Sequence, residues 1–133
     1  NQLTVTEQAT TPYLFTAHAG QAATYNDGQV VLFHDIMYNL GNMYDALTGA
    51  ITAPRDGVYL VSIRPDPQVG QNLTLQIRVN GSVKFYAFDE HSDPTGVSAA
   101  LDLKAGDRIT VNCRGSAFVS EYSTLVSVVL IKP

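Results

Sequence analysis

Residues 73–79 read Leu-Thr-Leu-Gln-Ile-Arg-Val, an unbroken alternation of apolar and polar side chains, and Asn80-Gly81 follow directly. This alternation indicates a half-buried β-strand, because successive strand side chains point to opposite faces. Asn-Gly tolerates the positive φ angles of a tight turn and is the strongest short signal for a hairpin. We therefore expect a returning strand over residues 83–88. Its core face should carry Val83, Phe85 and Ala87.

Three further segments repeat this period of two, at residues 57–64, 97–103 and 108–113. Turn-forming residues separate them, for example Lys104-Ala105-Gly106. Apolar residues nowhere follow a helical spacing for more than about two turns. Short strands separated by turns predict an all-β protein, either an antiparallel sandwich or a barrel.

Residues 125–131, Leu-Val-Ser-Val-Val-Leu-Ile, are apolar on both alternate sets of positions apart from Ser127. A strand of this kind needs cover on both of its faces. In a domain of this size one face can pack in the core, and we expect the other to pack against a second subunit.

The composition limits the range of functions. The chain has 133 residues, enough for a single domain with one core. Only 15% of the residues are charged, and the net charge of −4 argues against binding to nucleic acid. No apolar run reaches the ~18 residues of a membrane span, so we expect no membrane partner. The single cysteine, Cys113, allows no intrachain disulfide, and it shares the parity of Ile109 and Val111, which predicts burial.

A longer-range spacing points to a family. Its landmarks are Phe33, Asn39, Tyr44, Ile51 and the run Gly57-Val58-Tyr59. This pattern resembles the signature of the C1q globular-head domain family, and the resemblance covers about residues 13–131. Ile51, Val61 and Ile63 stand where the family usually has aromatic residues. We interpret the chain as a divergent member, similar to the stand-alone C1q-domain proteins of molluscs.

The resemblance implies an all-β, ten-stranded jelly-roll β-sandwich that assembles as a compact homotrimer. We expect residues 1–12 to form a polar N-terminal arm and residues 13–133 to form the domain. The implied function is a secreted, extracellular, lectin-like pattern-recognition protein of innate immunity that binds carbohydrate on microbial surfaces or acidic glycans. The alternative is a trimerisation or receptor-binding head domain of a collagen-like or cytokine-like secreted protein. The sequence contains no G-x-S-x-G or H-E-x-x-H motif, and we do not expect an enzyme.

An acidic segment lies between two of the expected strands. Asp89, Glu90 and Asp93 place three of the twelve acidic side chains within five positions. Ca²⁺ prefers hard oxygen ligands on an adaptable loop. Some family members carry calcium-binding acids in the aligned loop, so the resemblance implies Ca²⁺ as a cofactor with these three residues as metal ligands. The alternative is a solvated acidic loop without a metal.

Other candidate residues lie at expected strand ends and loops. Arg64, Arg114 and Tyr122 offer the donors and the aromatic face that sugars and acidic groups favour, and we take them as candidate ligand-binding residues. The alternative is that they are ordinary surface residues. Asn72 begins an Asn-Leu-Thr sequon and is the candidate glycosylation site. A second sequon begins at Asn80, where the expected turn already explains the residue.

If Asp89, Glu90 and Asp93 bind calcium, titration with Ca²⁺ should release or absorb heat and raise the melting temperature, and EDTA should reverse that rise. Asp93→Asn should weaken both effects, because it removes an anionic oxygen ligand. A titration without heat, together with a melting temperature that EDTA leaves unchanged, would exclude the site.

Overall fold

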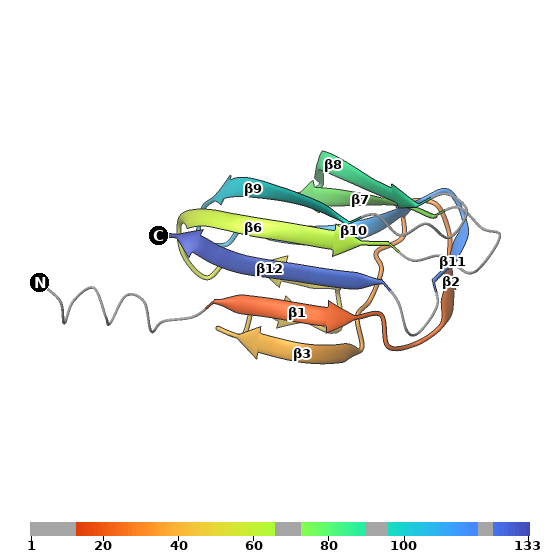
Figure 1. The fold of residues 1–133 in the computed structure, drawn as a ribbon, viewed down its shortest axis with the longest axis horizontal. Coiled ribbons are helices and arrows are strands. Elements are labelled where there is room, and N and C mark those ends of the chain that lie inside the picture. Colours follow the sequence, from red (N-terminus) through yellow and green to blue (C-terminus); the bar gives the residue numbers. More distant parts are fainter. Residues whose placement is uncertain (1–12, 66–72, 90–95, 120–123) are drawn as a thin grey trace, which may run out of the picture.

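The computed structural model describes residues 13–65, 73–89, 96–119 and 124–133. Within these residues the chain forms strands and turns, and it contains no helix that could cross a membrane. Two five-stranded antiparallel sheets lie back to back, a small two-stranded sheet lies at one end, and the C-terminus lies at the other (Figure 1). We call the two larger sheets the first and the second sheet.

The first sheet has the order β3 (Asp35–Leu40), β1 (Leu14–His18), β12 (Leu125–Lys132), β6 (Gly57–Arg64) and β9 (Val97–Leu103). The second sheet has the order β4 (Tyr44–Asp45), β5 (Ala50–Thr52), β10 (Arg108–Arg114), β7 (Leu73–Val79) and β8 (Ser82–Asp89). The two-stranded sheet pairs β11 (Ala117–Val119) with β2 (Ala23–Tyr25). The two larger sheets supply the ten expected strands, and the small sheet is an addition that the sequence pattern does not predict.

Burial follows the predicted alternation. In β7 the even-numbered residues are half-buried, and the buried side chains are Leu73, Leu75, Ile77 and Val79. In β6 the buried side chains are Tyr59, Val61 and Ile63. The buried faces of the two sheets meet in one hydrophobic core. Of the two architectures that the period of two predicts, a sandwich or a barrel, the structure forms the sandwich.

The Asn80-Gly81 hairpin is also confirmed. Both residues have positive φ angles, 51° for Asn80 and 87° for Gly81, as a two-residue turn of this type requires. The Asn80 side chain accepts a hydrogen bond from the Arg108 backbone N–H and donates one to the Asp107 carboxylate, each at 3.0 Å. The hairpin is thereby tied to the start of β10.

One prediction for the returning strand is wrong. The register shifts between Ile77 and Arg78, so that Phe85 pairs with Ile77 but Val83 pairs with Arg78. This bulge places Lys84 in the ladder as an extra residue and turns Val83 to the outer face, where it is 39% exposed. The extra residue of a bulge exchanges the inward-facing and outward-facing positions on one side of it. The alternation of apolar and polar residues in the sequence does not reveal this exchange.

The landmarks of the family-like spacing hold a turn in place. Asn39 Oδ1 accepts hydrogen bonds from the backbone N–H groups of Met43 at 2.9 Å and Tyr44 at 3.2 Å. In the turn between them, Gly41 has a φ of 91°, and a Cβ at this position would collide with the ring of Tyr13. Both the backbone angle and the lack of space therefore require glycine.

Two buried tyrosines from the same stretch connect distant elements. The Tyr44 ring from the second sheet stacks on Phe15 from the first, with centroids 4.5 Å apart. Its hydroxyl accepts a hydrogen bond from the Phe33 backbone N–H at 2.8 Å, and burial raises the pKa of this hydroxyl. Tyr59 donates its hydroxyl to the Arg55 carbonyl at 2.7 Å. The spacing of these tyrosines thus reflects packing and turn formation.

Cys113 is fully buried, as its parity predicts. Burial, and after it the negative charge of Asp27, raises the pKa of the thiol. A protonated, buried thiol is a poor nucleophile. Cys113 therefore serves the packing of the core.

We predict that Asn80→Ala lowers the free energy of unfolding by about 1–2 kcal/mol, because alanine disfavours the positive φ and leaves the two bonds to β10 unmade. Urea denaturation measures this change. Ser82→Ala is the matched control, since it removes the same sequon and leaves both residues with positive φ and the two bonds to β10 unchanged. An equal loss in both variants, or a loss in neither, would contradict the structural role of Asn80.

Candidate functional site: the outer faces of the two sheets

Each larger sheet buries one face in the core and turns the other outward. Directly paired residues of neighbouring strands point to the same face, so the registers define what each outer face carries. On the first sheet one row crosses four strands and holds only large apolar side chains. We call it the apolar row, and its members are Leu40, Leu14, Val129 and Leu60.

Two more rows lie beside the apolar row on the first sheet. In the next row the hydroxyls of Thr16 and Ser127 are 3.2 Å apart, and those of Ser62 and Ser98 are 2.9 Å apart. The third row contains His18, whose Nδ1 is buried and has no hydrogen-bond partner within the described residues. The two central rows of this face therefore carry apolar and hydroxyl side chains and no charge.

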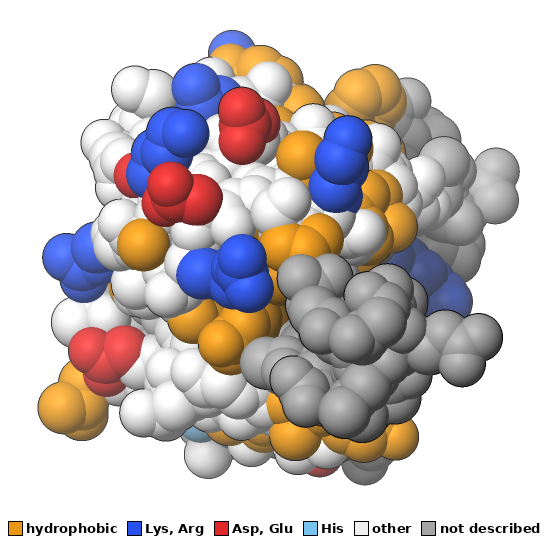
Figure 2. Space-filling model, turned by 90° about the vertical axis from the view of Figure 1, so that its left-hand side faces the viewer, with side chains coloured by type: hydrophobic (Ala, Val, Ile, Leu, Met, Phe, Trp, Pro, Cys, Tyr) orange, Lys and Arg blue, Asp and Glu red, His pale blue; other side chains and the backbone are white. Residues whose placement is uncertain are grey.

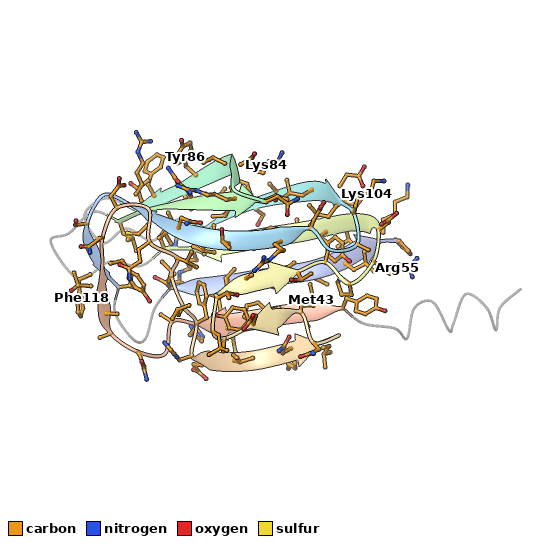
Figure 3. All side chains as sticks on the ribbon, turned by 180° about the vertical axis from the view of Figure 1, so that it is seen from behind. Met43, Arg55, Lys84, Tyr86, Lys104 and Phe118 are labelled. Carbon is orange, nitrogen blue, oxygen red and sulfur yellow. The ribbon has the colours of Figure 1, made fainter. Side chains whose placement is uncertain are left out.

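The outer face of the second sheet has a different chemistry. The registers place Arg114, Thr74 and Phe88 in one row and Gln76 opposite Tyr86 in the next. We call this surface the cationic–aromatic face, and its members are Arg78, Arg108, Arg114, Tyr86 and Phe88. Tyr86 and Phe88 are exposed on β8, the edge strand of the sheet, and Figure 3 shows Tyr86 there.

Neighbouring side chains hold two of these arginines. Arg78 donates to Gln76 Oε1 from Nε at 2.9 Å and from Nη2 at 2.6 Å. The guanidinium carbon of Arg114 lies 5.4 Å from the centroid of the Tyr86 ring, a cation–π contact. None of the three arginines forms an ion pair with a carboxylate in the part of the chain that the structure describes. Among the described residues, the face therefore presents cations without a carboxylate partner beside aromatic rings.

Charges of both signs are mixed elsewhere on the surface. Figure 2 shows basic and acidic side chains interspersed on the end of the sandwich that carries the C-terminus. A cleft of about 430 Å³ between β8 and β9 has Lys84, Asp102 and Asp107 in its lining. Hydrogen bonds from the Lys104 backbone and the Asn80 amide lower the pKa of the Asp107 carboxyl, which stays charged at neutral pH. This cleft is less suited to an anion than the cationic–aromatic face.

The structure separates the two arginines that the sequence analysis selects. Arg64 ends β6 on the outer face of the first sheet, opposite Leu125. Arg114 ends β10 on the outer face of the second sheet. Since the two outer faces point in opposite directions, Arg64 and Arg114 do not form one site. Tyr122 lies outside the described residues.

The candidate calcium and glycan sites lie almost wholly outside the described residues. Asp89 is the last residue of β8 and pairs with Leu73, whereas Glu90, Asp93 and Asn72 fall in the segments that are not described. Within the described residues, no three His, Cys, Asp or Glu side chains lie close enough together to hold a metal ion. Calcium binding therefore stays a prediction from the sequence.

The binding residues predicted from the sequence do not include four members of the cationic–aromatic face, namely Arg78, Arg108, Tyr86 and Phe88. A signal for three of them is present, because Arg78, Tyr86 and Phe88 occupy the outward positions of the predicted hairpin. Their neighbourhood with Arg108 and Arg114 depends on the pairing of β7 with β10, two strands separated by about thirty residues of chain. That pairing is a property of the tertiary fold.

Comparison with solved structures identifies the architecture. The globular domain of zebrafish complement 1qA protein matches with a TM-score of 0.70 and 18% sequence identity, covering 89% of this chain and 96% of that chain. Murine APRIL matches with a TM-score of 0.68 and 15% identity, covering 90% and 99%. Rabbit GITRL matches with a TM-score of 0.58 and 11% identity, covering 89% and 93%. The sandwich is therefore the jelly roll that the sequence resemblance implies.

Sequence comparison agrees with the fold. Human complement C1q tumor necrosis factor-related protein 3 is 27% identical over 119 residues, which cover 84% of this chain and 48% of the human protein. The chain thus spans about half the length of that relative. The model of the C1q domain matches residues 14–127, from the first strand of the sandwich into the last. With most of the domain matched, and with its landmark residues holding the turns and the core, the chain belongs to the C1q domain family.

Proposed function

We propose that this protein is a secreted, non-enzymatic recognition module that assembles as a homotrimer and binds acidic glycans, including those of microbial surfaces. The cationic–aromatic face carries this proposal. Its three arginines have no carboxylate partner among the described residues, and two exposed aromatic rings lie beside them. Guanidinium groups bind carboxylate and sulfate oxygens, and aromatic faces pack against sugar rings.

The outer face of the first sheet supports self-association. The apolar row and the hydroxyl row cross the centre of this sheet without a charge. Contact with another copy would remove the apolar row from water, which is favourable. Closed symmetry makes a homotrimer one way to cover three such faces together.

The two faces are compatible with each other. Because the sheets lie back to back (Figure 1), an assembly through the first sheet leaves the cationic–aromatic face of the second sheet turned outward in every copy. Three equal weak sites on one rigid particle bind a repeated ligand far more tightly than one site does. The proposed mechanism is therefore recognition by avidity.

The alternative function is a head domain that trimerises a longer protein or engages a receptor. The length of the human relative, of which this chain spans about half, favours this reading. A glycan array that includes microbial polysaccharides separates the two functions. Retention on acidic glycans supports the recognition module. If the protein binds none of the glycans on the array but binds one protein tightly, the result supports the head domain.

The proposed assembly predicts a particle of about three times 14.4 kDa in size-exclusion chromatography with light scattering. Val129→Lys should convert it to monomers, because a lysine in the apolar row would bury its charge between copies. Val83→Lys is the matched control on the outer face of the second sheet and should leave the trimer intact. A monomeric wild-type protein would contradict the assembly.

The proposed ligand class predicts binding to sulfated or carboxylated glycans that weakens as salt is added, since exposed charges are screened. Arg114→Gln should lower the affinity for these glycans about tenfold, the effect of losing one charge-assisted contact. Arg55→Gln changes the net charge equally, away from the face, and should leave the affinity unchanged. Equal effects of the two variants in biolayer interferometry would show attraction by net charge and no defined face.

A further inference from the structure

The cationic–aromatic face contains a hollow of about 260 Å³ whose lining includes Arg78, Asn80, Arg108 and Thr110. Arg78 and Arg108 come from neighbouring strands, because Arg78 pairs with Thr110, two residues after Arg108. On one face of a sheet such diagonal neighbours lie roughly 7–8 Å apart at Cα, within reach of long side chains. We call this site the arginine hollow.

The other polar groups of the arginine hollow are already engaged. The Thr110 hydroxyl donates to Asn112 Oδ1 at 2.7 Å, and the Asn112 amide donates to the Gly28 carbonyl at 3.0 Å. The Asn80 amide is occupied by Asp107 and by the Arg108 backbone. The two guanidinium groups are therefore the main donors that remain for a ligand. Gln76 uses one side of the Arg78 guanidinium and fixes its orientation.

From this arrangement we infer that the arginine hollow binds the carboxylate or sulfate group of a linear acidic polysaccharide, whose chain runs along β10 and β7 towards Arg114 and Tyr86. This inference rests on the proposed function and adds the subsite and the shape of the ligand. Arg78 and Arg108 both line the hollow, and a guanidinium group matches the planar or tetrahedral oxygen arrangement of these anions. A single compact sugar acid would fill the hollow but would leave Arg114 unused.

The spacing of the cations favours a linear ligand. Arg108 and Arg114 lie on one strand and point to one face, six residues apart, which corresponds to ~20 Å at a rise of ~3.4 Å per residue. Arg78 lies beside this line on the neighbouring strand. Tyr86, under the Arg114 guanidinium, adds an aromatic surface at the far end. A chain with an acidic group on successive sugars would meet the arginine hollow and Arg114 together.

Affinity measured against chondroitin sulfate disaccharide, tetrasaccharide and octasaccharide tests this inference on the intact protein. We expect affinity to rise steeply from the disaccharide to the octasaccharide, because only the longer fragments reach both subsites. Arg78→Gln and Arg108→Gln should each weaken every fragment about tenfold. Arg114→Gln should weaken the octasaccharide about tenfold and leave the disaccharide within about twofold. Arg78→Lys keeps the positive charge but lacks the forked donor geometry of a guanidinium group. Its affinity should therefore lie between that of the wild type and that of Arg78→Gln.

Arg55→Gln and the melting temperature of each variant serve as controls for net charge and for folding. If acidic glycans bind but Arg78→Gln and Arg108→Gln behave like Arg55→Gln, the arginine hollow is not the subsite, while the proposed function stands. If the disaccharide binds as tightly as the octasaccharide, the ligand is not a linear chain. If no acidic glycan binds at all, the proposed function itself fails. Duplex DNA of matching length that binds as tightly as the octasaccharide would overturn the assignment to polysaccharides.

Discussion

Phe15 and Tyr44 stack between the two sheets, one from each sheet, and the Tyr44 hydroxyl accepts a hydrogen bond from the backbone of Phe33. This contact belongs to a core that takes one side of the strands in both large sheets. Because strand side chains alternate between two faces, a strand that commits one face to the core has only the other face for function. The position of every candidate site follows from this constraint.

The two outer faces divide the remaining chemistry between them. The outer face of the first sheet carries Leu14, Val129 and Leu60 with their neighbours, a surface suited to another protein copy. The outer face of the second sheet carries arginines and aromatic rings, a surface suited to an acidic ligand. This division depends on the two outer faces pointing in opposite directions, because a contact between copies through one face leaves the other face free. In the function that we propose, one small β-sandwich both assembles and binds its ligand.

Much of the fold could be predicted from local patterns. The alternation in β7, the Asn80-Gly81 turn and the burial of Cys113 each depend on residues close together in the sequence. The direction of Val83 could not be predicted, because the bulge opposite Arg78 arises from how β7 and β8 fit side by side. The candidate ligand-binding residues were harder still to predict from the sequence. Arg114 was selected from its own chemistry, but its partner Tyr86 lies beside it only through strand pairing.

The sequence by itself determined the period of two, the turns between strands and the spacing of Asn39, Tyr44 and Tyr59 that marks the family. These features act over a few residues, through backbone angles, parity and local hydrogen bonds. Only the tertiary structure decided that Arg64 and Arg114 face opposite ways and that Arg78 and Arg108 border one hollow. The physical reason is register: side chains from strands far apart in the chain share a face only after those strands have paired.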